Sequence, residues 1–125
     1  MKFLALAVCA TGLAFAQNWP VRPANLTIRF APATELMSGV PIPFKIQVTD
    51  PLHKPVVQAK VTLEIHRPDR TKTAVFKAPA IDRGVYMAKP VFPSPGTWEV
   101  YVEVRWEDQH GGRTIKYNVP RSAAP

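Results

Sequence analysis

The sequence predicts an all-β fold in which two antiparallel sheets pack face to face as a β-sandwich. The clearest observation is the strict alternation over residues 97–106, because successive Cβ atoms of a strand point to opposite faces. The apolar face of this strand consists of Trp98, Val100, Val102, Val104 and Trp106. Such a face requires a second layer to cover it. The second observation is that similar runs, separated by turns containing Pro and Gly, fill the chain after its N-terminal segment.

Alternation and turn residues together predict an immunoglobulin-like antiparallel β-sandwich of about seven strands. The expected strands are residues 25–31, 43–50, 57–66, 73–78, 85–91, 97–106 and 113–119. In the third strand we expect Val57 to face the core and His66 to face solvent. The fourth strand carries Val75 beside Phe76, which cannot both face inward, so it is expected at an edge or a bulge. Residues 110–112 (HGG) are expected to form a hairpin loop.

The N-terminal residues 1–16 have the features of a secretory signal peptide. Lys2 precedes an apolar stretch, and residues 14–16 (AFA) match a small-x-small cleavage pattern, so the mature chain is expected to begin at Gln17. The apolar stretch is shorter than the roughly 20 residues that span a bilayer, and no transmembrane anchor is expected. Lipidation of Cys9 and retention of the whole segment are the two alternatives.

The predicted domain organisation follows from these patterns. It consists of a signal peptide at 1–16, an extended Pro-rich leader at 17–24, the β-sandwich at 25–119 and a flexible tail at 120–125. Cys9 is the only cysteine and lies in the segment expected to be removed, so the mature domain is expected to lack disulfides and thiol chemistry. This composition favours a bacterial periplasm or cell surface. We expect a monomer.

The formal net charge of +7 favours contact with anionic surfaces or acidic glycans. The basic residues are scattered singly along the chain and form no block. Export makes nucleic acid an unsuitable partner. The charge therefore indicates a solvated positive surface more than a specific site.

Three segments carry a resemblance to a known family. They are residues 50–61 (DPLHKPVVQAKV), 84–88 (GVYMA) and 95–100 (PGTWEV). In this order and spacing they resemble the D..g.Pv.gA.V, G.Y.a and pG.W.v patterns of the YtkA-like and FixH-like family. The resemblance implies an exported or membrane-tethered β-sandwich, and some FixH-like members are linked to assembly of a copper-containing respiratory oxidase. Gly84 and Gly96 fit tight turns, and Tyr86 is expected at the sandwich edge as a hydrogen-bonded corner tyrosine.

Copper is the metal that the side chains of the mature chain would suit, since imidazole and thioether groups are copper ligands. The candidate ligands are His53, His66 and Met37, with His53 paired to Met37 or to His66 as the first hypothesis. His110 is expected in a turn, where a solvated histidine is ordinary, and Met87 is expected in the core. No two of these residues form a close pair in the sequence, so no cofactor is required by the pattern.

Catalysis is not indicated by any motif, and the chain is predicted not to be an enzyme. Ser38 and Ser94 have no base or orienting group nearby in the sequence. Glu99 and Glu103 lie on an exposed strand face, where pairing with basic residues of neighbouring strands is the ordinary role.

The function predicted from the sequence is that of a non-enzymatic accessory or interaction domain at the bacterial cell envelope, with an envelope protein of unknown identity as partner. A periplasmic copper-binding or oxidase-assembly protein is the first alternative. A glycan-binding module is the second, and it would use the exposed aromatic residues Trp19, Tyr101 and Trp106.

Overall fold

The computed structural model describes residues 22–23 and 25–121 of the chain. It contains β-strands β2 (Arg22–Pro23), β3 (Thr27–Pro32), β4 (Phe44–Thr49), β5 (Lys60–His66), β6 (Ala74–Lys77), β7 (Ala80–Asp82), β8 (Val85–Ala88), β9 (Gly96–Trp106) and β10 (Gln109–Val119). The expected signal peptide, Cys9, Trp19 and residues 122–125 of the expected tail lie outside the described residues. Among the described residues, no helix is long and apolar enough to cross a membrane.

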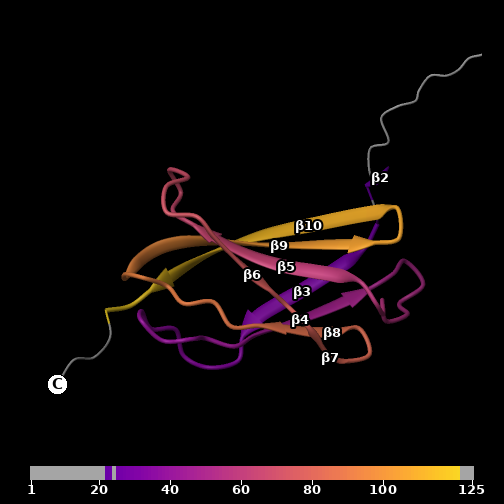
Figure 1. Cartoon of the computed structure of the whole chain (residues 1–125), viewed down its shortest axis with the longest axis horizontal. Coiled ribbons are helices and arrows are strands. Elements are labelled where there is room, and N and C mark those ends of the chain that lie inside the picture. The colour runs from indigo at the N-terminus through magenta and orange to yellow at the C-terminus, as the bar shows by residue number, and fades with distance from the viewer. Residues whose placement is uncertain (1–21, 24, 122–125) are drawn as a thin grey trace, which may run out of the picture.

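The strands form two sheets that pack as the two layers visible in Figure 1. One sheet has the order β2-β10-β9-β5-β6, and the other has the order β3-β4-β8-β7. Neighbouring strands are antiparallel except for the short pairing of β2 with the start of β10. The prediction of an all-β, immunoglobulin-like sandwich is confirmed.

The core lies between the apolar faces of the two sheets. Trp98, Val100, Val102 and Val104 of β9 are fully buried, as the alternation predicts. Phe44, Ile46 and Val48 of β4 are also fully buried. Phe92 joins the two layers, with its ring centroid 5.9 Å from that of Trp98 and 6.2 Å from that of Phe44. Burying each such side chain contributes about 1.5–3 kcal/mol to folding, so this layer dominates the stability of the domain.

The hairpin between β9 and β10 corrects the predicted loop at residues 110–112, which belongs to β10. The turn consists of Glu107 and Asp108, because Trp106 pairs with Gln109. Glu107 takes a left-handed backbone conformation, with φ 58°, and so supplies the turn geometry without a glycine. The side chain of Tyr101 lies over Gly112, where a Cβ would meet its hydroxyl. The glycine is therefore needed for packing across the strands, and not for a turn.

The third strand also differs from its prediction, because β5 begins at Lys60. Gln58 has φ 60°, which breaks the alternation, and Val56 is fully buried in place of Val57. His66 was expected to face solvent, yet its residue is only 3% exposed. It lies on the outer side of the sheet, where two glutamates enclose it. A period-two pattern places a side chain on a face but does not reveal how neighbouring side chains cover it.

The two open sides of the sandwich are built differently. On one side, Arg113 of β10 donates a hydrogen bond to the carbonyl oxygen of Ile28 in β3 at 2.8 Å, and Gly111 of β10 lies close to Leu26 and Ile28. These contacts join the two sheets at that side. On the other side, the chain itself crosses from β6 to β7 through residues 78–79, and the edge strands of both sheets lie there. The second side carries the site described next.

Candidate functional site: an apolar groove between β6 and the β7–β8 hairpin

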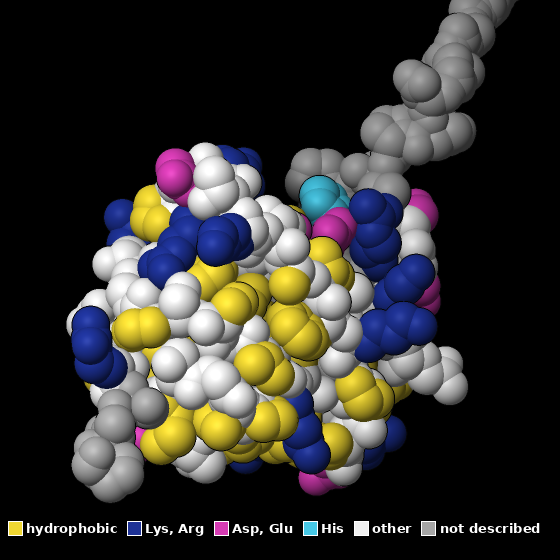
Figure 2. Space-filling view, turned by 60° about the vertical axis from the view of Figure 1, so that its left-hand side comes forward, with side chains coloured by type: hydrophobic (Ala, Val, Ile, Leu, Met, Phe, Trp, Pro, Cys, Tyr) yellow, Lys and Arg dark blue, Asp and Glu magenta, His cyan; other side chains and the backbone are white. Residues whose placement is uncertain are grey.

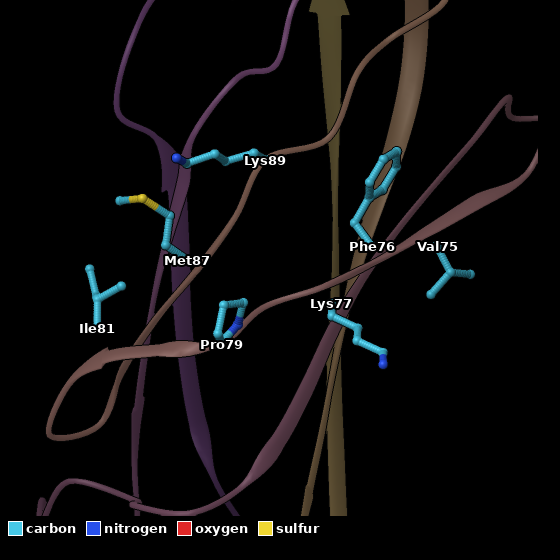
Figure 3. Close-up of a pocket in the computed structure, with 7 residues that line it drawn as sticks. All are labelled: Val75, Phe76, Lys77, Pro79, Ile81, Met87 and Lys89. Atoms are coloured by element: carbon cyan, nitrogen blue, oxygen red, sulfur yellow. The ribbon is translucent and has the colours of Figure 1, made fainter.

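A groove of about 600 Å³ lies between β6 and the β7–β8 hairpin. The lining residues come from β6, from the crossing segment, from β7 and from the end of β8, and they are Val75, Phe76, Lys77, Pro79, Ile81, Met87 and Lys89. Figure 3 shows the β6 side chains on one side of the groove, with Met87, Ile81 and Lys89 opposite and Pro79 between them. The groove is thus formed by segments from both sheets.

The groove is apolar in its interior and basic at its margin. Val75 and Ile81 are large aliphatic side chains that are 61% and 54% exposed, while Phe76 and Met87 are half-buried. The charged side chains among the lining residues are those of Lys77 and Lys89, and no lining residue is acidic. An exposed apolar patch with a polar margin is typical of an interaction site.

The local sequence explains why these apolar side chains face outward. Tyr86 and Ala88 of β8 point into the core, so Met87 between them must point to the outer face, which corrects its expected core position. In β6, Phe76 packs against the core, and Val75 therefore faces away from it. The strand was expected at an edge or a bulge, and the structure shows the edge, because β6 is the last strand of its sheet.

The candidate copper ligands are not gathered at one place. Met37 lies in the loop before β4 and His53 in the turn after it, so the length of β4 separates them. His66 ends β5 and is buried beside two carboxylates. The described residues contain no group of three or more His, Cys, Asp or Glu side chains arranged to hold a metal ion. Copper binding by this chain therefore stays a prediction from the sequence.

His66 forms a buried polar cluster on the outer face of the five-stranded sheet. Its Nδ1 lies 3.1 Å from Oε2 of Glu64, and its Nε2 lies 2.9 Å from Oε1 of Glu99. Both ring nitrogens thus lie within hydrogen-bond distance of carboxylate oxygens. Because the two carboxylates bind different nitrogens of the ring, the cluster is a structural hydrogen-bonded group and leaves no common point for a ligand.

Of the aromatic residues proposed for glycan binding, the two that the structure describes, Tyr101 and Trp106, do not form one platform. Tyr101 and Trp106 point to opposite faces of β9, since their positions differ by an odd number. Trp106 packs against the core cluster, and Tyr101 leans over Gly112. Burial raises the pKa of the Tyr101 hydroxyl above its ordinary value, and the charges of Glu103 and Glu64 raise it further. Glycan binding stays a prediction of the sequence.

Two of the three sequence segments that suggested a family, residues 50–61 and 84–88, meet in space at Tyr86. Its hydroxyl donates a hydrogen bond to the carbonyl oxygen of Val56 at 2.7 Å and accepts one from the Ala59 N–H at 3.2 Å. Gly84 has φ 70°, and a Cβ there would lie 2.6 Å from the Cβ of Pro55. Tyr86 was expected at the sandwich edge, but it is fully buried; the hydrogen bonding expected of it is present. These motif residues therefore hold the fold together.

The third motif segment is held by an arginine that the motif does not include. The guanidinium of Arg67 lies 4.2 Å from the ring centroid of Trp98. It also donates hydrogen bonds to the Ser94 hydroxyl and to the carbonyl oxygens of Pro95 and Thr97. This contact secures the turn before β9.

The fold and these contacts define an all-β, immunoglobulin-like sandwich whose motif residues act in folding. The model of the YtkA-like family matches residues 21–103, and the chain belongs to this family. The match includes all three motif segments and ends within β9. A comparison with curated proteins finds no match.

The groove was not foreseen from the sequence. The available signal was the adjacent pair Val75 and Phe76, which indicated that one apolar side chain of the edge strand must face outward. Ile81, which lies between Pro79 and a turn at Asp82, was the second unexplained apolar residue. Ile81 lies near Met87 because β7 pairs with β8, and local sequence patterns do not predict this pairing.

Proposed function

We propose that this protein is a non-enzymatic, exported accessory protein of the bacterial cell envelope that binds an envelope partner through the groove between β6 and the β7–β8 hairpin. The observation that carries the proposal is the groove itself, with its exposed Val75 and Ile81. A monomeric domain that leaves these side chains in water gains free energy when a partner covers them.

A binding role agrees with the chemistry of the groove. Its titratable side chains are two lysines, and no lining residue offers a nucleophile beside a base. Binding sites are commonly apolar pockets with a few polar groups that orient the ligand, and this groove has that composition. A catalytic role would require groups that the lining residues do not supply.

Export is the second part of the proposal, and it is supported by the features of residues 1–16. Fractionation of cells that express the full chain with a C-terminal tag tests it. We expect the protein in the periplasmic or surface fraction, with an N-terminus at Gln17. Recovery in the cytoplasm with Met1 retained would contradict export.

Binding at the groove is tested by photocrosslinking in the same cells. A photoreactive amino acid at Ile81 lies in the groove, and one at Leu52, which is 73% exposed in the turn after β4, serves as the control. We expect a discrete crosslinked product from position 81 and none of the same mass from position 52. Equal products from both positions, or none from position 81, would contradict the proposed site.

A further inference from the structure

We infer that the groove binds an extended polypeptide segment whose side chains alternate between apolar and acidic, and that this segment adds to the free edge of β6 as a new strand. The inference rests on the proposed function, because it names the kind of partner that the groove accepts. Three features carry it: the backbone of β6, the apolar interior of the groove and the charge of its margin.

The backbone of β6 offers a ready template for a further strand. In an antiparallel pair, every second residue exchanges both hydrogen bonds with its partner, and the residues between direct their N–H and C=O groups away. Ala78 donates to the carbonyl oxygen of Val61 at 3.0 Å, so Phe76, two residues earlier, also faces β5. Val75 and Lys77 then direct their backbone groups outward, at the end of the sheet. Main-chain hydrogen bonds to such an edge are the basis of strand addition.

The apolar interior lies directly beside this edge. Phe76 of β6 and Ile81 and Met87 of the hairpin line the same groove, and Figure 3 shows them on its two sides. A strand paired with β6 would direct every second side chain toward these residues, because side chains alternate along a strand. Apolar residues at those positions would bury Ile81, now 54% exposed.

The charge of the margin selects for carboxylates. Lys77 and Lys89 are exposed and lie on opposite sides of the groove, and no lining residue neutralises them. Figure 2 shows one face of the molecule with hydrophobic side chains over its middle and lower part, and with Lys, Arg and some acidic side chains toward its margins. An acidic strand gains from these charges, whereas a basic strand is repelled.

A peptide suits the groove better than a lipid for one structural reason. A fatty acid or a lipid would use the apolar interior and the lysines but would leave the outward backbone groups of Val75 and Lys77 without a partner. On the opposite side of the sandwich, Arg113 of β10 binds the Ile28 carbonyl oxygen of β3 and so joins the two sheets. A partner strand that pairs with β6 closes the open side with backbone hydrogen bonds.

Selection of displayed random peptides of about ten residues on the purified full-length protein tests the inference. We expect selected sequences that alternate between apolar and acidic residues. Addition of a selected peptide should protect the amides of Val75 and Lys77 from hydrogen exchange. Methylation of alternate backbone nitrogens of the peptide should weaken binding at least about tenfold, since each methyl group removes a donor.

Two charge variants test the role of the margin. Lys77→Glu with Lys89→Glu should weaken binding of the selected peptide about tenfold. The matched control is Arg29→Glu with Lys116→Glu, which makes the same change in net charge on β3 and β10, at the other side of the sandwich. The control should bind as the wild type does.

Selected peptides that are basic, that bind equally well to the lysine variant, or that leave both amides unprotected would overturn the inference. Displacement of the peptide by oleate, without protection of Val75 and Lys77 by any peptide, would indicate a lipid site and would also overturn it. The proposed function is tested separately. A partner crosslinked at Ile81 without strand pairing would refute only the inference and leave the proposed function in place. Absence of both the crosslink and the peptide binding refutes both.

Discussion

The hydroxyl of Tyr86 lies 2.7 Å from the carbonyl oxygen of Val56 and ties β8 to the segment that leads into β5. Tyr86 lies in a strand of the four-stranded sheet, Val56 precedes a strand of the five-stranded sheet, and the two are 30 positions apart in the sequence. The same hydroxyl accepts the Ala59 N–H, so one buried side chain satisfies two backbone groups of a segment without regular structure. Residues 56–59 can therefore pass from one sheet to the other without leaving these groups unpaired.

Tyr86→Phe is expected to destabilise the fold by about 1–3 kcal/mol, because it leaves the buried Val56 carbonyl and the Ala59 N–H without their partner. Urea denaturation of both proteins measures the loss. Tyr117→Phe is the control, since that hydroxyl makes no hydrogen bond within the part of the chain that the structure describes. Equal stability of the Tyr86 variant and the wild type would show that the hydrogen bonds contribute nothing.

Gly84→Ala is expected to cost more than Gly39→Ala, although both glycines have positive φ angles, of 70° and 84°. At each position the left-handed backbone lowers the stability of the alanine variant by about 1–2 kcal/mol. At position 84 the new Cβ would also meet the Cβ of Pro55 at 2.6 Å, whereas position 39 has nothing within 4 Å. Thermal denaturation of the two variants isolates the contact with Pro55. A smaller loss at position 84 than at position 39 would refute the packing argument.

His66→Leu is expected to destabilise the protein by about 1–3 kcal/mol, because it leaves the partly buried carboxylates of Glu64 and Glu99 without their shared hydrogen-bond partner. His110→Leu is the comparison. Its ring lies 3.7 Å from a Glu103 oxygen and is more exposed, so its loss should cost less than about 1 kcal/mol. Chemical denaturation at neutral pH distinguishes them, and similar values for both variants would count against the buried cluster.

Alkaline pH is expected to reveal the environment of Tyr101. Burial, followed by the charges of Glu103 and Glu64, raises its pKa above the ordinary value of 10.0. The folded state therefore holds the phenolic proton more tightly than the unfolded state. The contribution of this group to stability is fully present below about pH 10 and is lost as the pH rises through the pKa of the folded state.

Ultraviolet titration of the phenolate measures this effect. Burial also raises the pKa of Tyr117, so the Tyr101→Phe variant is needed to assign the transition. This variant should lose one high-pH transition and should lose less stability than the wild type above pH 10. A Tyr101 that titrates at its ordinary pKa would contradict the packing of its ring over Gly112.

Local patterns predicted the strands well where one side of the strand faces the core. The alternation around Trp98 and the motif residue Gly84 each indicated their structural role correctly, because period two and a left-handed turn are local properties. Prediction failed at positions whose residue type or burial depends on contacts with residues distant in the sequence. Gly112 is needed because Tyr101 lies over it, and His66 is buried because Glu99 from another strand covers it.

The candidate site was the least predictable part for the same reason. Ile81 and Met87 meet Phe76 only because the chain crosses between the sheets at Pro79, and pairing of β7 with β8 then sets their positions. The expected copper ligands were chosen by residue type alone. Residue type alone does not predict that His53 and Met37 lie beyond opposite ends of β4.

The measurement that tests the central claim most directly is the affinity of the partner captured at Ile81 for two variants, Ile81→Asp and Leu52→Asp. Both positions are exposed, so both variants should fold, and their melting temperatures serve as the check. The groove account predicts that Ile81→Asp weakens binding at least about tenfold while Leu52→Asp leaves it unchanged. Equal affinity of both variants and the wild type would contradict the assignment of the groove as the binding site.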